Sequence, residues 1–282
     1  MNTHSAEEVL RAWRESAPYW EKHGHLIRTM FEPITRALID EAGIRPGQSV
    51  LDVAGGTGEP SLAIAEVVGL SGLVTCTDAV AEMLAAAERE AARRQLPNVK
   101  FRQCEADSLP FESNGFDVAV CRLGVMFFPD PLASLREMLR VTKPGGRLSL
   151  AVWRDAEFNP FFRIVTEVIS RYLETLPGDP EAPGAFRFAE PGKLASMLKQ
   201  AGAANIVERV FNFHIQAPMT PEEFWRLRTE TSDTLREKVA QLSAEQLHQA
   251  TREVQAAAQE FFLNHQMSFP AQAIIVTGER LK

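Results

Sequence analysis

A cluster of small residues stands out in the segment 50–60, which reads VLDVAGGTGEP. Gly55, Gly56 and Gly58 lie between an apolar run that reaches Asp52 and a stretch with helical spacing. Glycine permits unusual backbone angles and lets another molecule approach the backbone closely. The segment therefore has the composition of a ligand-binding turn between a strand and a helix, although a plain tight turn would also use one or two of these glycines.

Two more acidic residues stand at the ends of the next two apolar runs. Asp78 ends the run LVTCTD, where a carboxylate can accept hydrogen bonds from both hydroxyls of a ribose. Asp107 follows the run VKFRQCEA, where a carboxylate can accept from the amino group of an adenine. Ligands of open α/β sheets bind outside the carboxyl ends of the strands. Three successive strand ends therefore carry groups that suit one nucleoside.

A dinucleotide site is the first alternative, but its glycine spacing G-x-G-x-x-G is not met. From Gly56 the chain reads GTGEPS, so Ser61 takes the place of the third glycine. Glu59 is compatible with a helix start, but it would repel a pyrophosphate, and Pro60 would crowd it. The motif GK[ST] of a phosphate-binding loop is absent. The loop thus favours a cofactor without phosphate and disfavours a nicotinamide-dependent oxidoreductase.

Alternating strand and helix patterns position these residues. We expect strands at 49–54, 73–78, 99–106, 116–124, 147–153, 205–215 and 271–279, with helices at 59–68, 81–94 and 130–142 between the first five. Such alternation implies right-handed crossovers. The predicted fold is α/β: a Rossmann-like, doubly wound, mostly parallel seven-stranded sheet with helices on both faces and added helical cap segments.

The domain organisation follows from where this rhythm breaks. We expect an N-terminal helical cap (1–45), a cofactor-binding core (46–155), a helical and loop cap insertion (156–189), a core helix and strand (190–217), a helical insertion (218–267) and a terminal core strand (268–282).

Composition limits the partners and the compartment. The formal net charge of -7 disfavours a nucleic-acid partner, and no apolar run is long enough to span a bilayer. Cys76, Cys104 and Cys121 lie far apart in apolar runs, without metal-ligand spacing. We therefore expect buried, reduced thiols, no metal and a cytoplasmic location. Nothing in the sequence indicates the oligomeric state.

Four segments together resemble successive motifs of class I S-adenosylmethionine-dependent methyltransferases, above all the ubiquinone- and menaquinone-biosynthesis type and its small-molecule relatives. They are VLDVAGGTGEPSLAIA, TDAVAEML, EADSLPFESNGFDVAVCRLGVMFF and MLRVTKPGGRLSLAVW. The resemblance is strong over residues 49–153 and weaker beyond them. It implies S-adenosyl-L-methionine as the cofactor and S-adenosyl-L-homocysteine as its product, and it says little about the acceptor.

The resemblance assigns roles around the methionine part and the ribose of the cofactor. Asp52 and the loop would face the methionine part, and Asp78 would bind the ribose hydroxyls. The backbone of Cys121 and Arg122 would meet the methionine amino group. The loop comprises Ala54, Gly55, Gly56, Thr57 and Gly58, with Ala54 in place of the usual first glycine. Asp52 could instead only cap a turn.

Further residues would surround the adenine. Ala79 and Met83 would lie beside the ring, Asp107 would accept from its amino group, and the Ser108 amide would donate to a ring nitrogen. Met83 could instead be a core residue, because it stands on an apolar helix face.

The acceptor should lie over the sulfonium, under segments that are rich in aromatic residues. Those outside the sheet are Trp13, Tyr19, Trp20, Phe31, Phe158, Phe161, Phe162 and Trp225, and those at strand ends are Phe127, Phe128 and Trp153. We place Tyr19, Trp20, Phe127 and Trp153 on the substrate side.

The segment SAPYWEKHG suggests a lid, because Pro18 and Gly24 punctuate a bend beside two aromatic residues. A helix that only covers the sheet edge is the alternative. His23, His25 and His214 are candidate general bases, with His23 first because it belongs to this segment.

These observations predict an enzyme that moves a methyl group from S-adenosylmethionine to a small apolar or aromatic acceptor, on oxygen, carbon or nitrogen. The general base and the acceptor itself stay open. An S-adenosylmethionine-binding regulatory protein without turnover is the second hypothesis.

Overall fold

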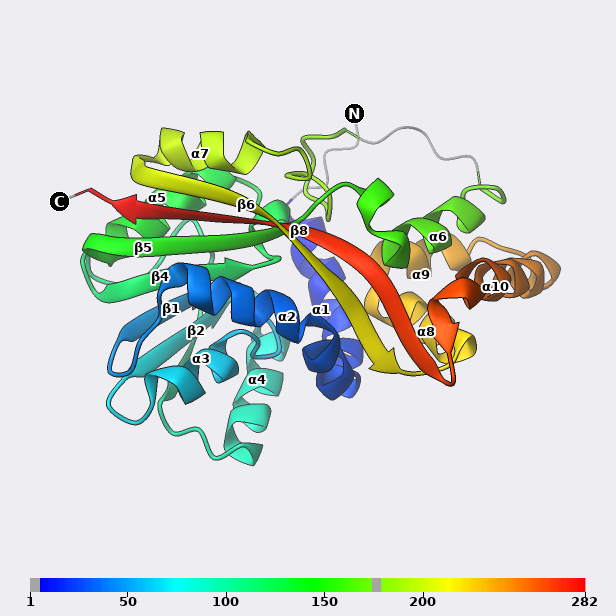
Figure 1. The fold of residues 1–282 in the computed structure, drawn as a ribbon, viewed down its shortest axis with the longest axis horizontal. Helices are drawn as coiled ribbons and strands as arrows, with labels where there is room; N and C mark the ends of the chain where they lie inside the picture. Colours follow the sequence, from blue (N-terminus) through cyan, green and yellow to red (C-terminus); the bar gives the residue numbers. More distant parts are fainter. Residues whose placement is uncertain (1–5, 174–178, 282) are drawn as a thin grey trace.

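The computed structural model describes residues 6–173 and 179–281. A central sheet runs in the order β3 (Val99–Gln103), β2 (Leu73–Asp78), β1 (Ser49–Val53), β4 (Phe116–Arg122), β5 (Thr142–Trp153), β8 (Gln266–Arg280) and β6 (Ala203–Pro218) (Figure 1). The first five strands are parallel, and β8 is antiparallel to both of its neighbours. The predicted seven-stranded, mostly parallel sheet is confirmed, with a two-residue strand β7 (Phe262–Leu263) added beside β8.

The chain order of the strands reverses at β1. From β1 the chain goes outward to β2 and β3, and it then returns to β4 on the other side of β1. Such a switch point leaves a crevice at the carboxyl ends of the strands. The end of β1 at Val53, the end of β2 at Asp78 and the end of β4 at Arg122 therefore border one hollow.

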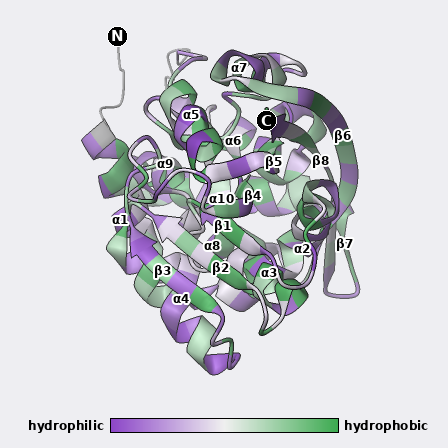
Figure 2. Ribbon diagram, turned by 90° about the vertical axis from the view of Figure 1, so that its left-hand side faces the viewer, coloured by the Kyte–Doolittle hydropathy of each residue, from purple (hydrophilic) through white to green (hydrophobic). Residues whose placement is uncertain are grey.

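The helices of the described residues are α1 (Ala6–Lys22), α2 (Gly24–Ala42), α3 (Ser61–Val68), α4 (Ala81–Arg93), α5 (Pro131–Val141), α6 (Pro160–Ile169), α7 (Lys193–Ala201), α8 (Pro221–Thr231), α9 (Asp233–Val239) and α10 (Ala244–Ala258). Helices α2 to α5 and α7 pack on the sheet, and the other helices pack largely on helices or on the arm described below. Figure 2 shows the interior strand β4 as hydrophobic, whereas α1 and α4 alternate between hydrophilic and hydrophobic residues. That alternation is expected for helices with one buried face.

Helix ends follow local chemistry. The Asp130 carboxylate accepts a hydrogen bond from the Ala133 N–H at 2.9 Å, and Pro131 occupies the first turn of α5. Gly202 ends α7 in a left-handed conformation, with φ at 108°. Thr220 and Ser243 each form a capping box, with Glu223 and Gln246 respectively.

The predicted N-terminal cap divides into two parts. Ile34 and Leu38 of α2 are completely buried in the main core, and α2 packs against β4, β5, β6 and β8. This helix is thus a layer of the core rather than a cap. Ala17 of α1 belongs to a separate small cluster with Val80 and Met83.

A long two-stranded arm carries the helical insertion. The register of β6 with β8 continues from Ala203–Arg280 to Pro218–Gln266, whereas β5 pairs with β8 only as far as Trp153–Ala273. The remainder projects beyond the sheet, with α8 and α10 beside it (Figure 1). Phe224 of α8 stacks on Phe269 of the arm at 5.1 Å between ring centroids.

Asn159 joins the end of β5 to this arm. Its buried side-chain amide donates to the carbonyls of Arg154, Asp155 and Gln272 at 2.8, 3.0 and 3.1 Å. Its Oδ1 accepts from the Gln272 N–H at 3.0 Å. Every hydrogen-bonding position of the amide except one lone pair is thus used.

We expect Asn159→Ala to lower the free energy of unfolding by about 2 kcal/mol or more, since buried backbone groups lose their partner. The measurement is guanidinium denaturation, with Gln216→Ala as the control. Gln216 bonds to Ser268 on the same arm but is exposed, so its loss should stay within about 0.5 kcal/mol. Equal effects of the two substitutions would contradict the role given to Asn159.

Candidate functional site

A cavity of about 420 Å³ opens at the carboxyl ends of β1, β2 and β4. This volume lies within the range of small-molecule sites. One wall comes from the loop after β1, the end of β2, the segment after β3 and the segment after β4. The opposite wall comes from α1, α2 and α4.

The glycine loop forms a cradle because side chains are absent where they would collide. Ala54, Gly55, Gly56 and Thr57, which the sequence places in the cofactor loop, line the cavity. A Cβ on Gly55 would lie 2.6 Å from the Cys76 Sγ. A Cβ on Gly124, which follows β4, would lie 2.7 Å from the Ala54 Cβ. Both glycines therefore let the segments after β1 and β4 pack closely on their neighbours, and with Gly56 they line the cavity without side chains.

Ala54 adopts a backbone conformation that favours glycine. Its φ is 58°, in the left-handed region, and Gly56 has φ at 55°. This conformation costs a residue with a Cβ roughly 1–2 kcal/mol. The usual glycine would avoid that strain, and the methyl group of Ala54 is still accommodated.

Asp78 closes the loop onto the end of β2. Its Oδ2 accepts from the Gly56 N–H and its Oδ1 from the Val80 N–H, both at 2.9 Å. Burial raises the pKa of this carboxyl to about 6, against the lowering effect of the two backbone hydrogen bonds. Asp78 also lines the cavity, and each oxygen keeps a further lone pair for a ribose hydroxyl.

Asp52 does not line the cavity, in contrast to the role implied for it. Its Oδ2 accepts from the Ser61 N–H at 3.0 Å and from the Ser61 hydroxyl at 2.6 Å. Burial raises its pKa to about 7, opposed first by the Ser61 hydroxyl. Asp52 therefore supports the start of α3 from beneath the loop, which is the turn-capping alternative. Gly58 also faces inward, with a Cβ position 3.0 Å from Leu62.

Of the four residues expected beside the adenine, three lie at the cavity. Ala79, Met83 and Asp107 line the cavity. Met83 also packs in the small apolar cluster with Ala17. It is therefore both a lining residue and a core residue. Ser108 does not line the cavity, because its N–H donates to the Glu105 carbonyl at 3.3 Å.

Cys104 departs from the expectation of buried thiols. It is only partly buried and lines the cavity just beyond β3. Burial raises its pKa to about 11. The thiols of Cys76 and Cys121 are buried as expected, and the Cys121 side chain is not part of the lining.

Aromatic rings form the wall opposite the loop. Trp13 packs edge-to-face on Trp20 at 5.6 Å and on Phe127 at 5.0 Å, and all three line the cavity together with Phe31 and Phe128. The sequence places Trp20 and Phe127 on the substrate side, whereas it names Trp13, Phe31 and Phe128 only among the aromatic residues near the acceptor. The spacing of Trp13 and Trp20, seven positions apart on one helix face, is the signal that could have found Trp13.

Two of the predicted substrate-side residues lie elsewhere. Trp153 is buried in the core against Phe31 and Phe162, with ring centroids 5.5 and 4.9 Å apart. Tyr19 lies beneath the Arg236 guanidinium at 5.1 Å. Neither contributes to the cavity lining.

The three candidate bases, all histidines, lie in different parts of the structure. His23 bonds to Glu230 at 2.5 Å and lies outside the cavity lining. His214 is exposed on the projecting arm. His25 does line the cavity, so the position of the side chain favours His25 over His23, which the sequence places first.

The N-terminal helix and the distant helical insertion form one cover. The Trp20 indole N–H donates to the Thr231 carbonyl at 3.1 Å, and Lys22 pairs with Glu230 at 2.8 Å. Arg236 donates to the Ser16 hydroxyl at 2.8 Å. Helix α1 is thus held over the cavity by α8 and α9. That it opens and closes as a lid stays a prediction.

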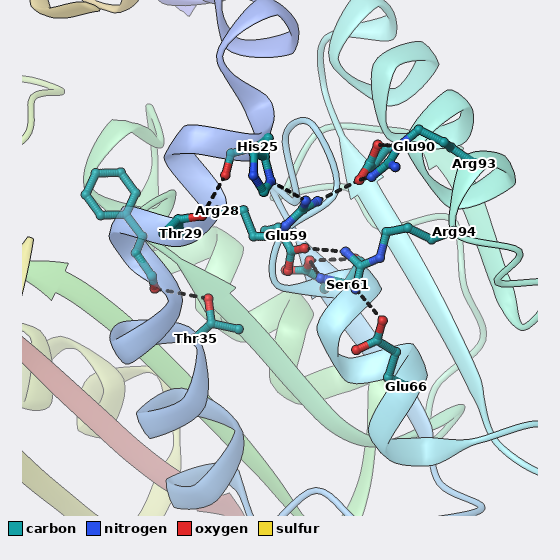
Figure 3. A network of polar contacts seen from close by, with 12 residues as sticks. His25, Arg28, Thr29, Thr35, Glu59, Ser61, Glu66, Glu90, Arg93 and Arg94 are labelled. Carbon is teal, nitrogen blue, oxygen red and sulfur yellow. Dashed lines mark hydrogen bonds and ion pairs between the residues drawn. The ribbon is translucent and has the colours of Figure 1, made fainter. Parts of the chain in front are cut away.

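Ion pairs surround the mouth of the cavity, as Figure 3 shows for those from α2, α3 and α4. Arg28 donates to Glu90 at 2.6 Å, and Arg94 pairs with Glu59 at 2.6 Å. Because Glu59 is neutralised in this way, its charge is a weaker argument against phosphate than the sequence suggested. Within 6–173 and 179–281, no group of His, Cys, Asp and Glu residues could hold a metal ion.

Comparisons with known proteins bear on the family of this chain. Residues 31–165 match the model of the ubiE/COQ5 methyltransferase family. A demethylmenaquinone methyltransferase of Renibacterium salmoninarum is 38% identical over 141 residues, which cover 50% of this chain and 56% of that protein. The demethylmenaquinone methyltransferase of Staphylococcus aureus is 29% identical over 227 residues, 77% of this chain and 93% of that protein.

Among solved structures, the YcgJ protein of Bacillus subtilis has the same fold. Its TM-score is 0.57 at 22% sequence identity, and the alignment covers 88% of this chain and 98% of that one. At this identity the likeness bears on the fold alone.

The raised pKa of Asp78 predicts how nucleoside binding depends on pH. The carboxylate accepts hydrogen bonds well above a pH of about 6 and is neutral below it. We expect the affinity for 5′-methylthioadenosine, which has the ribose but no amino-acid part, to fall about tenfold between pH 7.5 and pH 5. Calorimetry measures this directly.

Asp78→Asn is the matched control, because it keeps the shape but cannot ionise. It should bind about tenfold or more weakly at pH 7.5 and show no loss over the same pH range. A wild-type affinity that is flat with pH, or a variant that retains the pH dependence, would contradict the role of Asp78.

Proposed function

We propose that this chain is a class I S-adenosylmethionine-dependent methyltransferase similar to the ubiE/COQ5 family, and that its acceptor is a flat aromatic compound of the hydroquinone or phenol class. The aromatic wall of Trp13, Trp20 and Phe127 carries this proposal, since planar ligands pack well on such rings. The names of the sequence relatives, which refer to demethylmenaquinone, point to the same class.

The residues present fit the cofactor. Gly55, Gly56 and Gly124 line the cavity with backbone and no side chain, and Asp78 and Asp107 provide acceptors for a nucleoside. The cofactor carries no phosphate, so it needs no phosphate-binding motif. When bound, S-adenosylmethionine supplies a methyl group that its sulfonium already activates for displacement.

The residues of the chain position the two reactants and exclude water from the reacting atoms. The strand ends fix the nucleoside, while the aromatic wall orients the acceptor ring and keeps solvent away from the reacting atoms. Holding two reactants in line can lower a barrier by ~7–11 kcal/mol. This contribution depends on α1, because Trp13 and Trp20 both come from that helix.

Among the described residues, His25 is the histidine that lines the cavity, and its Nδ1 is already engaged. The Arg28 Nη2 lies 2.8 Å from the His25 Nδ1, and arginine can only donate. The Nδ1 lone pair is therefore occupied by Arg28 and does not face an acceptor. An acceptor that ionises by itself, as a phenol or hydroquinone does, fits this arrangement better than an alcohol does.

A cytoplasmic location and a small-molecule partner complete the proposal. The free thiols of Cys76, Cys104 and Cys121 support a reducing compartment. Among the described residues, no helix is both long and apolar enough to cross a membrane.

The function is tested with S-adenosylmethionine that carries a labelled methyl group, offered with hydroquinones, phenols, amines and fatty acids. We expect label in the aromatic hydroxyl compounds and none in the fatty acids. Binding of the cofactor without transfer to any acceptor would favour the regulatory hypothesis, and tight binding of NAD instead would favour an oxidoreductase.

The occupied histidines generate a second prediction. His25→Asn and His23→Asn should each keep the turnover number within about threefold of wild type, since neither ring serves as the base. A loss of 10²-fold or more, which is typical for removal of a general base, would contradict this. Turnover should instead rise with pH in step with ionisation of the acceptor, measured over a series of substituted phenols.

A further inference from the structure

The cavity lining contains four arginines, and one of them differs from the rest. Arg28 pairs with Glu90 at 2.6 Å, Arg89 with Glu21 at 2.7 Å and Arg93 with Glu90 at 2.7 Å. Within the described part of the chain, Arg122 forms no ion pair. It is therefore the one lining cation there whose charge is not matched by a contacting carboxylate.

Thr35 positions the Arg122 side chain. The Nη1 donates to the Thr35 hydroxyl at 2.7 Å, and this hydroxyl in turn donates to the Phe31 carbonyl at 3.3 Å. The Nε of Arg122 is buried and has no hydrogen-bond partner. A guanidinium has five N–H donors, so most of its donor capacity remains unused.

The nearest carboxylates do not satisfy Arg122. Glu59 and Asp52 act on it only through space, and Glu59 is engaged by Arg94 and Asp52 by Ser61. Burial lowers the pKa of the guanidinium despite these charges. An unpaired cation in such a place is costly, which indicates that an anionic ligand group completes it.

The strand order says which part of the cofactor reaches this position. Asp107 follows β3, Asp78 ends β2, the glycine loop follows β1, and Arg122 ends β4. These four strands are neighbours, so the row spans roughly 14 Å at ordinary strand spacing. With the adenine at β3 and the ribose at β2, the amino-acid part of an extended cofactor lies over β1 and β4.

We propose that the Arg122 guanidinium, held by Thr35, binds the α-carboxylate of S-adenosylmethionine. This assigns the side chain a role in addition to the backbone contact with the amino group that the family resemblance implies. The inference rests on the proposed use of this cofactor, whose only carboxylate is the one in its amino-acid part.

The test compares two ligands that differ in that part. S-adenosylhomocysteine carries the carboxylate, and 5′-methylthioadenosine lacks the whole amino-acid head. In calorimetry, Arg122→Met should weaken S-adenosylhomocysteine roughly 10- to 100-fold, as expected for charge-assisted hydrogen bonds. The affinity for methylthioadenosine should change by less than about twofold. Thr35→Val should give a smaller loss with the same selectivity.

Two controls make the result decisive. Arg209→Met replaces an arginine paired with Glu41 outside the cavity and should leave both affinities unchanged. Thermal unfolding of the ligand-free Arg122→Met protein should show no large loss of stability, because replacing an unpaired buried cation with an apolar side chain of similar volume is often neutral or favourable.

The possible outcomes distinguish a wrong role for Arg122 from a wrong cofactor. Equal losses for the two ligands in Arg122→Met, or no loss for either, would overturn the role of Arg122 while leaving the methyltransferase function intact. Failure of the wild-type protein to bind both ligands would overturn the proposed cofactor and the inference with it.

Discussion

The structure depends on two hydrogen bonds accepted by one carboxylate. Asp78 holds the Gly56 N–H of one strand-to-helix loop and the Val80 N–H that follows its own strand. These bonds fix the spacing between the ends of β1 and β2, and hence the shape of the cradle. They also orient the carboxylate toward the cavity. The group that binds the nucleoside is thus the group that builds its site, so binding and local stability cannot be varied independently.

The second organising feature is the joining of distant segments into one cover. Helix α1 lies over the cavity because α8 and α9, more than 200 positions later in the chain, hold it through Trp20, Lys22 and Ser16. The arm of β6 and β8 makes this possible, since it carries the insertion beyond the end of the sheet. The core residues of α1 are few and belong to a small separate cluster. The cover is therefore attached by polar contacts at its end and by aromatic packing at the site, an arrangement suited to admitting an acceptor.

Charge is distributed unevenly around the cavity. The rim is rich in ion pairs, which leave little net attraction for a phosphate or an acidic polymer. Inside the cavity lie the Arg122 side chain, whose Nε has no hydrogen-bond partner, and the Asp78 carboxyl, whose pKa is raised. Perturbed ionisable groups cluster where ligands bind, and here they stand on either side of the glycine loop, at the ends of β2 and β4. The arrangement suits an extended molecule with hydroxyl groups at one end and a carboxylate at the other.

The sequence by itself determined the fold, the cofactor class and most of the cradle, because these depend on local order along the chain. Strand ends, glycines and Asp78 follow each other at spacings that the parallel sheet requires. It did not determine which side chains face the cavity. Asp52 bonds to Ser61, Trp153 is buried in the core, and His23 bonds to Glu230. Trp13 and His25, in contrast, line the cavity. Those outcomes depend on partners far away in the chain, and only tertiary packing decides which of two neighbouring residues meets such a partner and which meets the ligand.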